Sequence, residues 1–210
     1  MAAETKNVRN GVDLDQLTAA VEAVKQDPAN GKLTFTVSTR WNGGFKARHR
    51  AGTYVVGKEQ GQHLADHDLD TDEPREILGE DAGISPAEAI MSSLAACLTV
   101  GYAANAAAMG IDLDDLRFEI TANGSLEGFM NLGNKRPGLS DISIKALVTS
   151  SASPEKLREL HDFVNSHSPI WDTICNPVTI TSELVANPEE RSTARYAESG
   201  ASDAATMSPS

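Results

Sequence analysis

The longest apolar stretch of the chain, from Pro86 to Met109, limits the possible folds more than any other segment. Ser85 precedes it and Glu88 follows three residues later, which is the capping-box pattern of a helix start. Gly110 can adopt the left-handed conformation that ends a helix. At helical rise the stretch is about 36 Å long, enough to cross a bilayer. Several polar residues interrupt the stretch, and many of its apolar residues are small alanines, whereas membrane spans are usually more uniformly apolar. We therefore interpret it as the central core helix of a soluble domain.

Length and charge narrow the class of protein. At 210 residues the chain favours one domain with tails, and its net charge of −12 argues against nucleic acid as a partner, because phosphate binding needs a basic patch. The N-terminal sequence MAAETKNVRN lacks the apolar core of a signal peptide. We therefore expect a cytoplasmic protein with no membrane segment. In that compartment, paired cysteines are more often redox-active or catalytic than structural.

Hydrophobic periodicity predicts the other elements. Two amphipathic helices are expected, over residues 12–25 and 153–167, with a further short helical turn over 170–175. Alternating or apolar runs predict strands over residues 32–40, 45–56, 116–122, 141–149 and 178–184. The strands cluster in hairpins rather than alternating with helices, which indicates the α+β class. We divide the chain into an N-terminal helical extension (1–31), a main domain (32–185) and a disordered tail (186–210).

The acidic segment between residues 66 and 81 invites comparison with a calcium-binding loop. Such a loop needs Gly at its sixth position and Glu at its twelfth, and counting from Asp66 these positions hold Thr71 and Ile77. His63 and His67 are four residues apart, but no third ligand accompanies them. We therefore expect a solvated acidic loop, two surface histidines and no metal site.

Two blocks of sequence resemble a known family. The segment GISPAEAIMSSLAACL, which ends at Leu98, and the later SPIWDTICNPVTI, which begins at Ser168, resemble the two halves of the OsmC/Ohr family of osmotically inducible and organic hydroperoxide resistance proteins. The similarity runs from about Leu33 to Leu184 and makes residues 32–185 an OsmC-like domain. It implies an α+β fold in which antiparallel sheets wrap long central helices in an intertwined homodimer. It also implies a thiol peroxidase that reduces organic hydroperoxides in oxidative stress defence, with an external dithiol reductant and no bound cofactor.

The resemblance gives Cys97 the role of nucleophile. A peroxidatic thiolate attacks the O–O bond and becomes a sulfenic acid, and a second thiol then condenses with it to a disulfide. Cys97 lies among Ala and Leu some three turns into its helix, where a thiol is reactive only if the fold brings a cation to it. In the family, an arginine of the N-terminal hairpin does this and is held by a carboxylate. Arg40 is the best match, and Arg48 and Arg50 are alternatives.

Two departures from the family pattern affect the predicted site. The family glutamate directly follows the proline of the core helix, but here that position is Ala87. Glu88 is one residue on and roughly opposite Cys97 around a straight helix, so the capping box explains it better than catalysis does. The family also commonly has Cys-Pro after the second helix, but here Ser168 precedes the proline and Cys175 comes seven residues later.

Two functions follow from this pattern. In the first, the protein is a peroxidase with Cys97 as nucleophile, Arg40 as activating cation and Cys175 as resolving thiol. In the second, it is a non-catalytic OsmC-like dimer that binds a small apolar or thiol ligand.

Overall fold

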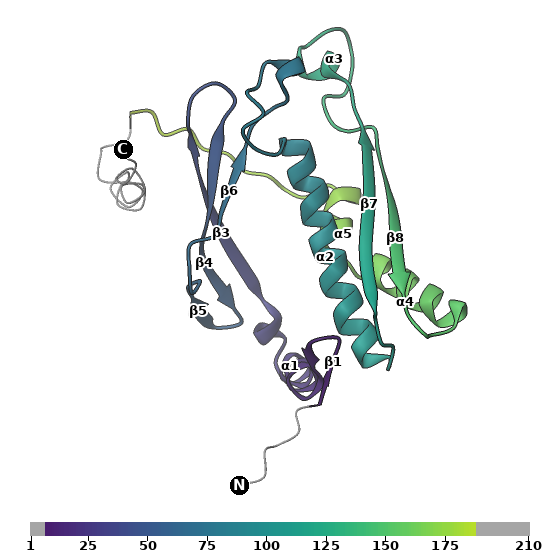
Figure 1. The fold of residues 1–210 in the computed structure, drawn as a ribbon. Coiled ribbons are helices and arrows are strands. Elements are labelled where there is room, and N and C mark those ends of the chain that lie inside the picture. Colours follow the sequence, from purple (N-terminus) through teal and green to yellow (C-terminus); the bar gives the residue numbers. More distant parts are fainter. Residues whose placement is uncertain (1–6, 188–210) are drawn as a thin grey trace, which may run out of the picture. The chain divides into compact units, whose positions relative to one another are not determined.

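The computed structural model describes residues 7–187 (Figure 1). The chain divides into two compact units, residues 1–176 and 177–210, and each is described by itself. The first unit contains the helices α1 (Leu14–Gln26), α2 (Pro86–Ala108), α3 (Leu126–Phe129), α4 (Pro154–Ser166) and α5 (Pro169–Cys175). Its strands are β1 (Val8–Arg9), β2 (Val12–Asp13), β3 (Leu33–Trp41), β4 (Ala47–Val56), β5 (Glu59–Gly61), β6 (Asp68–Thr71), β7 (Asp115–Asn123) and β8 (Asp141–Thr149). The predicted α+β class is therefore correct.

Helix α2 begins and ends where the sequence predicts. The Ser85 hydroxyl accepts a hydrogen bond from the Glu88 backbone N–H at 3.2 Å, and the Glu88 carboxylate accepts one from the Ser85 N–H at 2.7 Å. This completes the capping box. Gly110, at φ 72°, turns the chain away just after the helix ends. By length and composition alone α2 could cross a membrane, a test that the core helix of a soluble protein also passes.

One face of α2 forms the hydrophobic core. Leu94, Leu98, Tyr102 and Ala106 recur every fourth residue on this face and are at most 3% exposed. The core also contains residues of α4 and of the turn after α2, and it is covered by inward-facing residues of β7 and β8: Ile111, Phe118, Ile144, Leu160 and Val164. The opposite face of α2 is open, because Val100 is 69% exposed. In the single chain, α2 is thus buried on one face rather than on nearly all sides.

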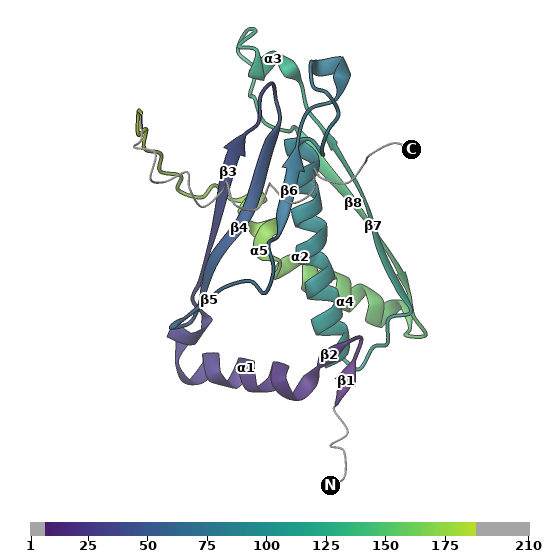
Figure 2. The same cartoon turned by 60° about the vertical axis from the view of Figure 1, so that its left-hand side comes forward.

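The N-terminal half of the domain contains an antiparallel sheet (Figure 2). β3 and β4 form the predicted hairpin, which turns at Asn42, Gly43 and Gly44, with both glycines at positive φ. β5 and β6 both pair with β4. β7 and β8 form a separate antiparallel pair, in full register from Asp115 opposite Thr149 to Asn123 opposite Asp141.

The acidic segment is only partly the solvated loop that the sequence predicts. Its first part is strand β6, in which Asp68 and Asp70 lie opposite Arg50 and Arg48 of β4 and form bidentate hydrogen bonds with them. These cross-strand ion pairs hold an acidic sequence in a sheet where propensity alone predicts none. The strand ends just before the buried carboxylate of Asp72.

Asp72 organises the loop that follows β6. It is 1% exposed, and its carboxylate accepts hydrogen bonds from the backbone N–H groups of Glu73, Glu80 and Ala82 at 2.9, 2.9 and 3.1 Å. Burial would raise the pKa of Asp72, but the three backbone donors together with the charge of Lys46 lower it below its ordinary value. The ionised carboxylate therefore holds the beginning and the end of this loop together, just before α2 begins.

The second unit is described only over residues 177–187. The predicted strand over residues 178–184 is not formed there, and the segment carries no helix or strand assignment. A strand needs hydrogen bonds from a neighbouring strand, and no strand of the described chain pairs with it. The apolar side chains of Val178, Ile180 and Leu184 are 55%, 86% and 90% exposed. The predicted disordered tail, 186–210, lies almost wholly outside the described residues.

Candidate thiol site

Cys97 lies on α2 and contacts the residue that begins α5. It precedes the buried Leu98 on α2, and its own side chain is partly exposed. The hydroxyl of Ser168 donates a hydrogen bond to the Cys97 sulfur, with an Oγ–Sγ distance of 3.2 Å. Ser168 is 6% exposed, so water competes little for this contact. The Cys97 sulfur is therefore in contact with a hydroxyl donor that is shielded from water.

The sequence explains why Ser168 lies there. Helix α4 ends at Ser166, and Ser168 is the N-cap of α5, where its Oγ accepts a hydrogen bond from the Trp171 backbone N–H at 3.3 Å. Pro169 occupies the first helical position, which needs no N–H donor. Ile170, Trp171 and Ile174 pack against the core and hold α5 beside α2.

Cys175 lies at the other end of α5. It is the last residue of that helix and is exposed, while Ile174 beside it packs against the core. At helical rise, Cys175 is about 10 Å along the axis from Ser168. Both cysteines are free. The residue in hydrogen-bond contact with Cys97 is therefore Ser168, and no disulfide or hydrogen bond joins the two cysteines in the described chain.

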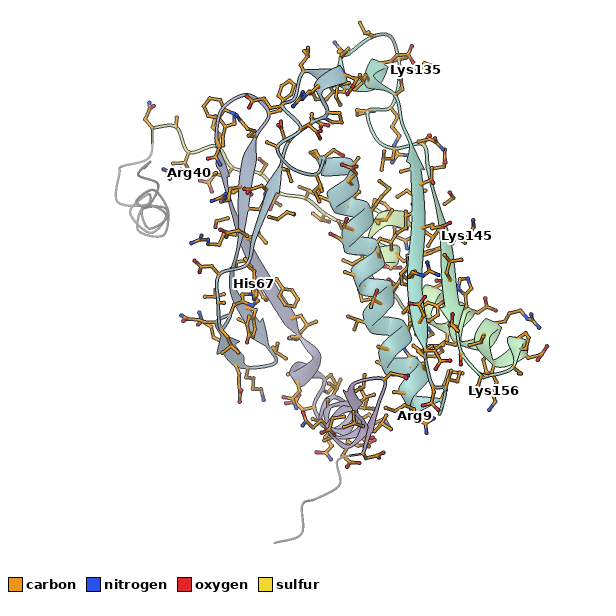
Figure 3. All side chains as sticks on the ribbon, in the orientation of Figure 1. Arg9, Arg40, His67, Lys135, Lys145 and Lys156 are labelled. Atoms are coloured by element: carbon orange, nitrogen blue, oxygen red, sulfur yellow. The ribbon has the colours of Figure 1, made fainter. Side chains whose placement is uncertain are left out.

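The three candidate arginines have different surroundings. Arg48 and Arg50 are held by the aspartates of β6, and the hydrogen bond and charge of Asp70 raise the pKa of Arg48 above its ordinary value. Arg40 is exposed near the end of β3, at the hairpin (Figure 3). No side chain of residues 7–187 forms an ion pair with Arg40. Of the three, it is the guanidinium that no carboxylate of the described chain holds.

Glu88 serves the helix cap. The hydrogen bonds from the Ser85 backbone N–H and then from the Ser85 hydroxyl lower the pKa of Glu88 below its ordinary value. Both carboxylate interactions stay within the first turn of α2, as the sequence predicts. No contact in the described structure joins Glu88 to an arginine.

A polar network near the site was not predicted. The hydroxyl of Tyr102 and the Nδ1 atom of His161 share a hydrogen bond of 2.6 Å, and His161 Nε2 contacts the Asn165 side chain at 2.9 Å. Burial, and then the charge of Asp162, raise the pKa of Tyr102 to about 12. The network joins α2 to α4, the helix that precedes Ser168 in the chain. The only sequence signal for it is a tyrosine on the apolar face of α2.

Comparison with known proteins identifies the family. The sequence model of the family described as OsmC-like protein matches residues 79–183, half of the chain. The α+β fold agrees with that match. The protein therefore belongs to the OsmC-like family. A search of curated proteins found no match.

Two solved structures share the fold at low sequence identity, and a third is similar at a lower TM-score. An OsmC-like protein from Mycoplasma pneumoniae is 21% identical, with 69% of this chain and 89% of that chain covered and a TM-score of 0.51. A candidate osmotic stress induced and detoxification response protein from Psychrobacter arcticus is 17% identical, with 69% and 90% covered and a TM-score of 0.52. The organic hydroperoxide resistance protein OhrB of Bacillus subtilis is 17% identical, with 72% and 98% covered and a TM-score of 0.45.

Proposed function

We propose that this protein is a cysteine-based peroxidase that reduces organic hydroperoxides, with Cys97 as the nucleophile. The observation that carries the proposal is the hydrogen bond from the Ser168 hydroxyl to the Cys97 sulfur, 3.2 Å long and formed at a buried serine. A thiolate needs such a donor, or a cation, to persist on an apolar helix. The OsmC-like family, with relatives named for organic hydroperoxide resistance, supports the substrate class.

The reaction is a two-electron transfer. The Cys97 thiolate attacks one peroxide oxygen, an S–O bond forms, the O–O bond breaks, and the alkoxide leaves and takes a proton to become an alcohol. Sulfur is oxidised to the sulfenic acid while the peroxide is reduced. One thiol of an external dithiol then attacks the Cys97 sulfur, so that a mixed disulfide forms and the hydroxide leaves as water. The second thiol of the dithiol attacks the dithiol's own sulfur in the mixed disulfide and releases the Cys97 thiolate.

Arg40 is the proposed activating cation. Arg48 and Arg50 are bound to the aspartates of β6, which leaves Arg40 as the hairpin arginine with no carboxylate partner in the described chain. A guanidinium within about 4 to 6 Å of a thiolate lowers the thiol pKa. We propose that the hairpin supplies Arg40 to a Cys97 site in the assembled protein.

That assembly is proposed to be a cytoplasmic homodimer. On β3, Leu33, Phe35 and Val37 are 60%, 66% and 67% exposed, and Val100 on the open face of α2 is 69% exposed. Contiguous apolar surface of this kind marks an interaction site. A second copy would cover both surfaces. Sedimentation at micromolar concentration should give twice the chain mass of 22.3 kDa, and a monomer would contradict this part of the proposal.

The second candidate function is a non-catalytic dimer that binds a small apolar or thiol ligand. Two observations favour it: Ser168 occupies the contact where a resolving thiol would act, and Glu88 is bound within its helix cap. This candidate predicts an unreactive Cys97.

Turnover separates the two functions. Cumene hydroperoxide and hydrogen peroxide are each supplied with dithiothreitol, and peroxide loss is followed for the wild type, Cys97→Ser and Arg40→Gln. The proposal predicts preferential consumption of cumene hydroperoxide, no turnover by Cys97→Ser and slower turnover by Arg40→Gln. Arg117→Gln is the matched control, because Arg117 is an exposed strand arginine whose ion pair is with the nearby Asp115. Equal turnover by wild type and Cys97→Ser would exclude the peroxidase.

A further inference from the structure

We propose that Ser168 is a catalytic residue that stabilises the Cys97 thiolate, and that oxidised Cys97 is reduced directly by a thiol from solution rather than by Cys175. The inference rests on the proposed peroxidase function. It adds a second residue at the reacting sulfur and gives Cys175, the resolving thiol that the sequence suggests, no part in the catalytic cycle.

The Ser168 hydroxyl has its donor hydrogen available for the Cys97 sulfur. A serine hydroxyl has one donor hydrogen and can accept two hydrogen bonds. The Oγ of Ser168 accepts the Trp171 N–H at 3.3 Å, which uses one lone pair and leaves the hydrogen free to be donated to the Cys97 sulfur at 3.2 Å. A thiolate can only accept, and a donor that is already oriented and shielded from water favours it most. The helix cap that begins α5 therefore also prepares the sulfur for attack.

Cys175 is carried by the other end of the same helix. Ser168 occupies the contact with the Cys97 sulfur, and Cys175 lies about 10 Å along the α5 axis from Ser168. Ile174, next to Cys175, packs against the core, so the end of α5 that is held at the sulfur is the one that carries Ser168. Cys97 itself is partly exposed and can be reached by a small thiol.

Reduction then proceeds in two balanced steps. A low-molecular-weight thiol attacks the Cys97 sulfur, an S–S bond forms, the S–O bond breaks, and the hydroxide leaves as water with the thiol proton. A second thiol attacks the external sulfur of the mixed disulfide, which releases the Cys97 thiolate and a small disulfide. The two thiols supply the two electrons that the sulfenic acid had lost.

Mass spectrometry after one equivalent of cumene hydroperoxide tests the resolution step. The reduced wild type and Cys175→Ser should both gain one oxygen, which dimedone traps on Cys97. Ser168→Cys should instead lose two hydrogens and give a cross-linked peptide of residues 97 and 168, because a closer approach of about 1 Å brings two sulfurs at this contact to bonding distance.

The outcomes separate a failure of this inference from a failure of the proposed peroxidase function. A wild type that loses two hydrogens and yields a Cys97–Cys175 peptide would overturn the inference and leave the peroxidase intact. No oxidation of Cys97 in either the wild type or Ser168→Cys would overturn the proposed function, and this inference with it.

The pH dependence of Cys97 alkylation by iodoacetamide tests the thiolate role. Removal of the donor in Ser168→Ala should move the midpoint to higher pH and slow alkylation at neutral pH about tenfold, since a hydrogen bond to a charged group is strong. Ser168→Thr keeps the hydroxyl and should restore the wild-type profile.

Ser153→Ala is the matched control for lost helix capping. Ser153 is also an N-cap serine followed by proline, at the start of α4, and its hydroxyl caps the Lys156 N–H with no cysteine contact. Its alkylation profile should equal that of the wild type. Coincident profiles for Ser168→Ala and the wild type would show that Ser168 is only a helix cap.

Discussion

Gly101 on α2 offers the sharpest test of how the core is packed. A Cβ atom at this position would lie 2.8 Å from Cγ1 of Val164 on α4, closer than atoms can pack. In an open helix, Gly to Ala stabilises by about 1 kcal/mol. Overpacking of a tight core costs about 1 to 3 kcal/mol. Because Val164 is 2% exposed and β-branched, it cannot move aside easily, and we expect Gly101→Ala to lower the free energy of unfolding by about 1 kcal/mol.

In a Val164→Ala background, Gly101→Ala should raise the free energy of unfolding instead of lowering it. Val164→Ala removes two methyl groups, and the transfer term and the cavity together should cost about 2 to 3 kcal/mol. In that background the clashing atoms are absent, so Gly101→Ala should regain about 1 kcal/mol of helix propensity. The two substitutions should therefore show a coupling of about 2 kcal/mol.

Urea unfolding followed by circular dichroism measures all four proteins, at one fixed protein concentration because assembly affects apparent stability. If Gly101→Ala stabilises the wild-type background, or if the two changes simply add, α2 and α4 do not approach each other as described.

Three further predictions concern polar groups. Tyr102→Phe should cost about 1 kcal/mol in urea unfolding by leaving the Nδ1 atom of His161 without its partner, and it should remove the phenol whose pKa is raised to about 12 from an absorbance titration. Ser85→Ala should cost about 1 kcal/mol in thermal or urea unfolding by removing the cap of α2, and a loss near zero would contradict the capping box. The fold lowers the pKa of Asp72. The contribution of the Asp72 carboxylate to the free energy of unfolding is therefore fully present above the ordinary aspartate pKa, and it is lost as the pH falls through the lowered pKa. Urea unfolding between pH 5 and 2 should therefore show a steeper loss for the wild type than for Asp72→Asn, and parallel curves would contradict this.

Local signals account for the parts of the fold that the sequence predicts. The capping box at Ser85 marks the start of α2, and the glycines after Asn42 mark the β3–β4 turn, because each depends on residues a few positions apart. Alternation along β7 and β8 is equally local. The clustering of strands in hairpins indicates the α+β class, and the family resemblance points to Cys97.

Contacts between distant residues explain what the sequence alone does not reveal. Strand β6 depends on the pairing of its aspartates with arginines of β4 about 20 residues earlier. The segment after Cys175 has the composition of a strand but no neighbour to pair with in the described chain. The hydrogen bond from Ser168 to Cys97 joins residues 71 apart. In the sequence, the one sign of this contact is that Ser168 stands where the family commonly has a cysteine.

The relative reactivity of the two cysteines tests the central claim most directly. The wild type contains both, so a single sample treated with a limiting amount of cumene hydroperoxide, then alkylated and digested, reports both rates. Exposure alone would make Cys175 the faster thiol. A Cys97 thiolate stabilised by Ser168 should instead be oxidised at least about tenfold faster than Cys175. If Cys175 is oxidised first, or if both react at the rate of an ordinary thiol, Cys97 is not the peroxidatic residue.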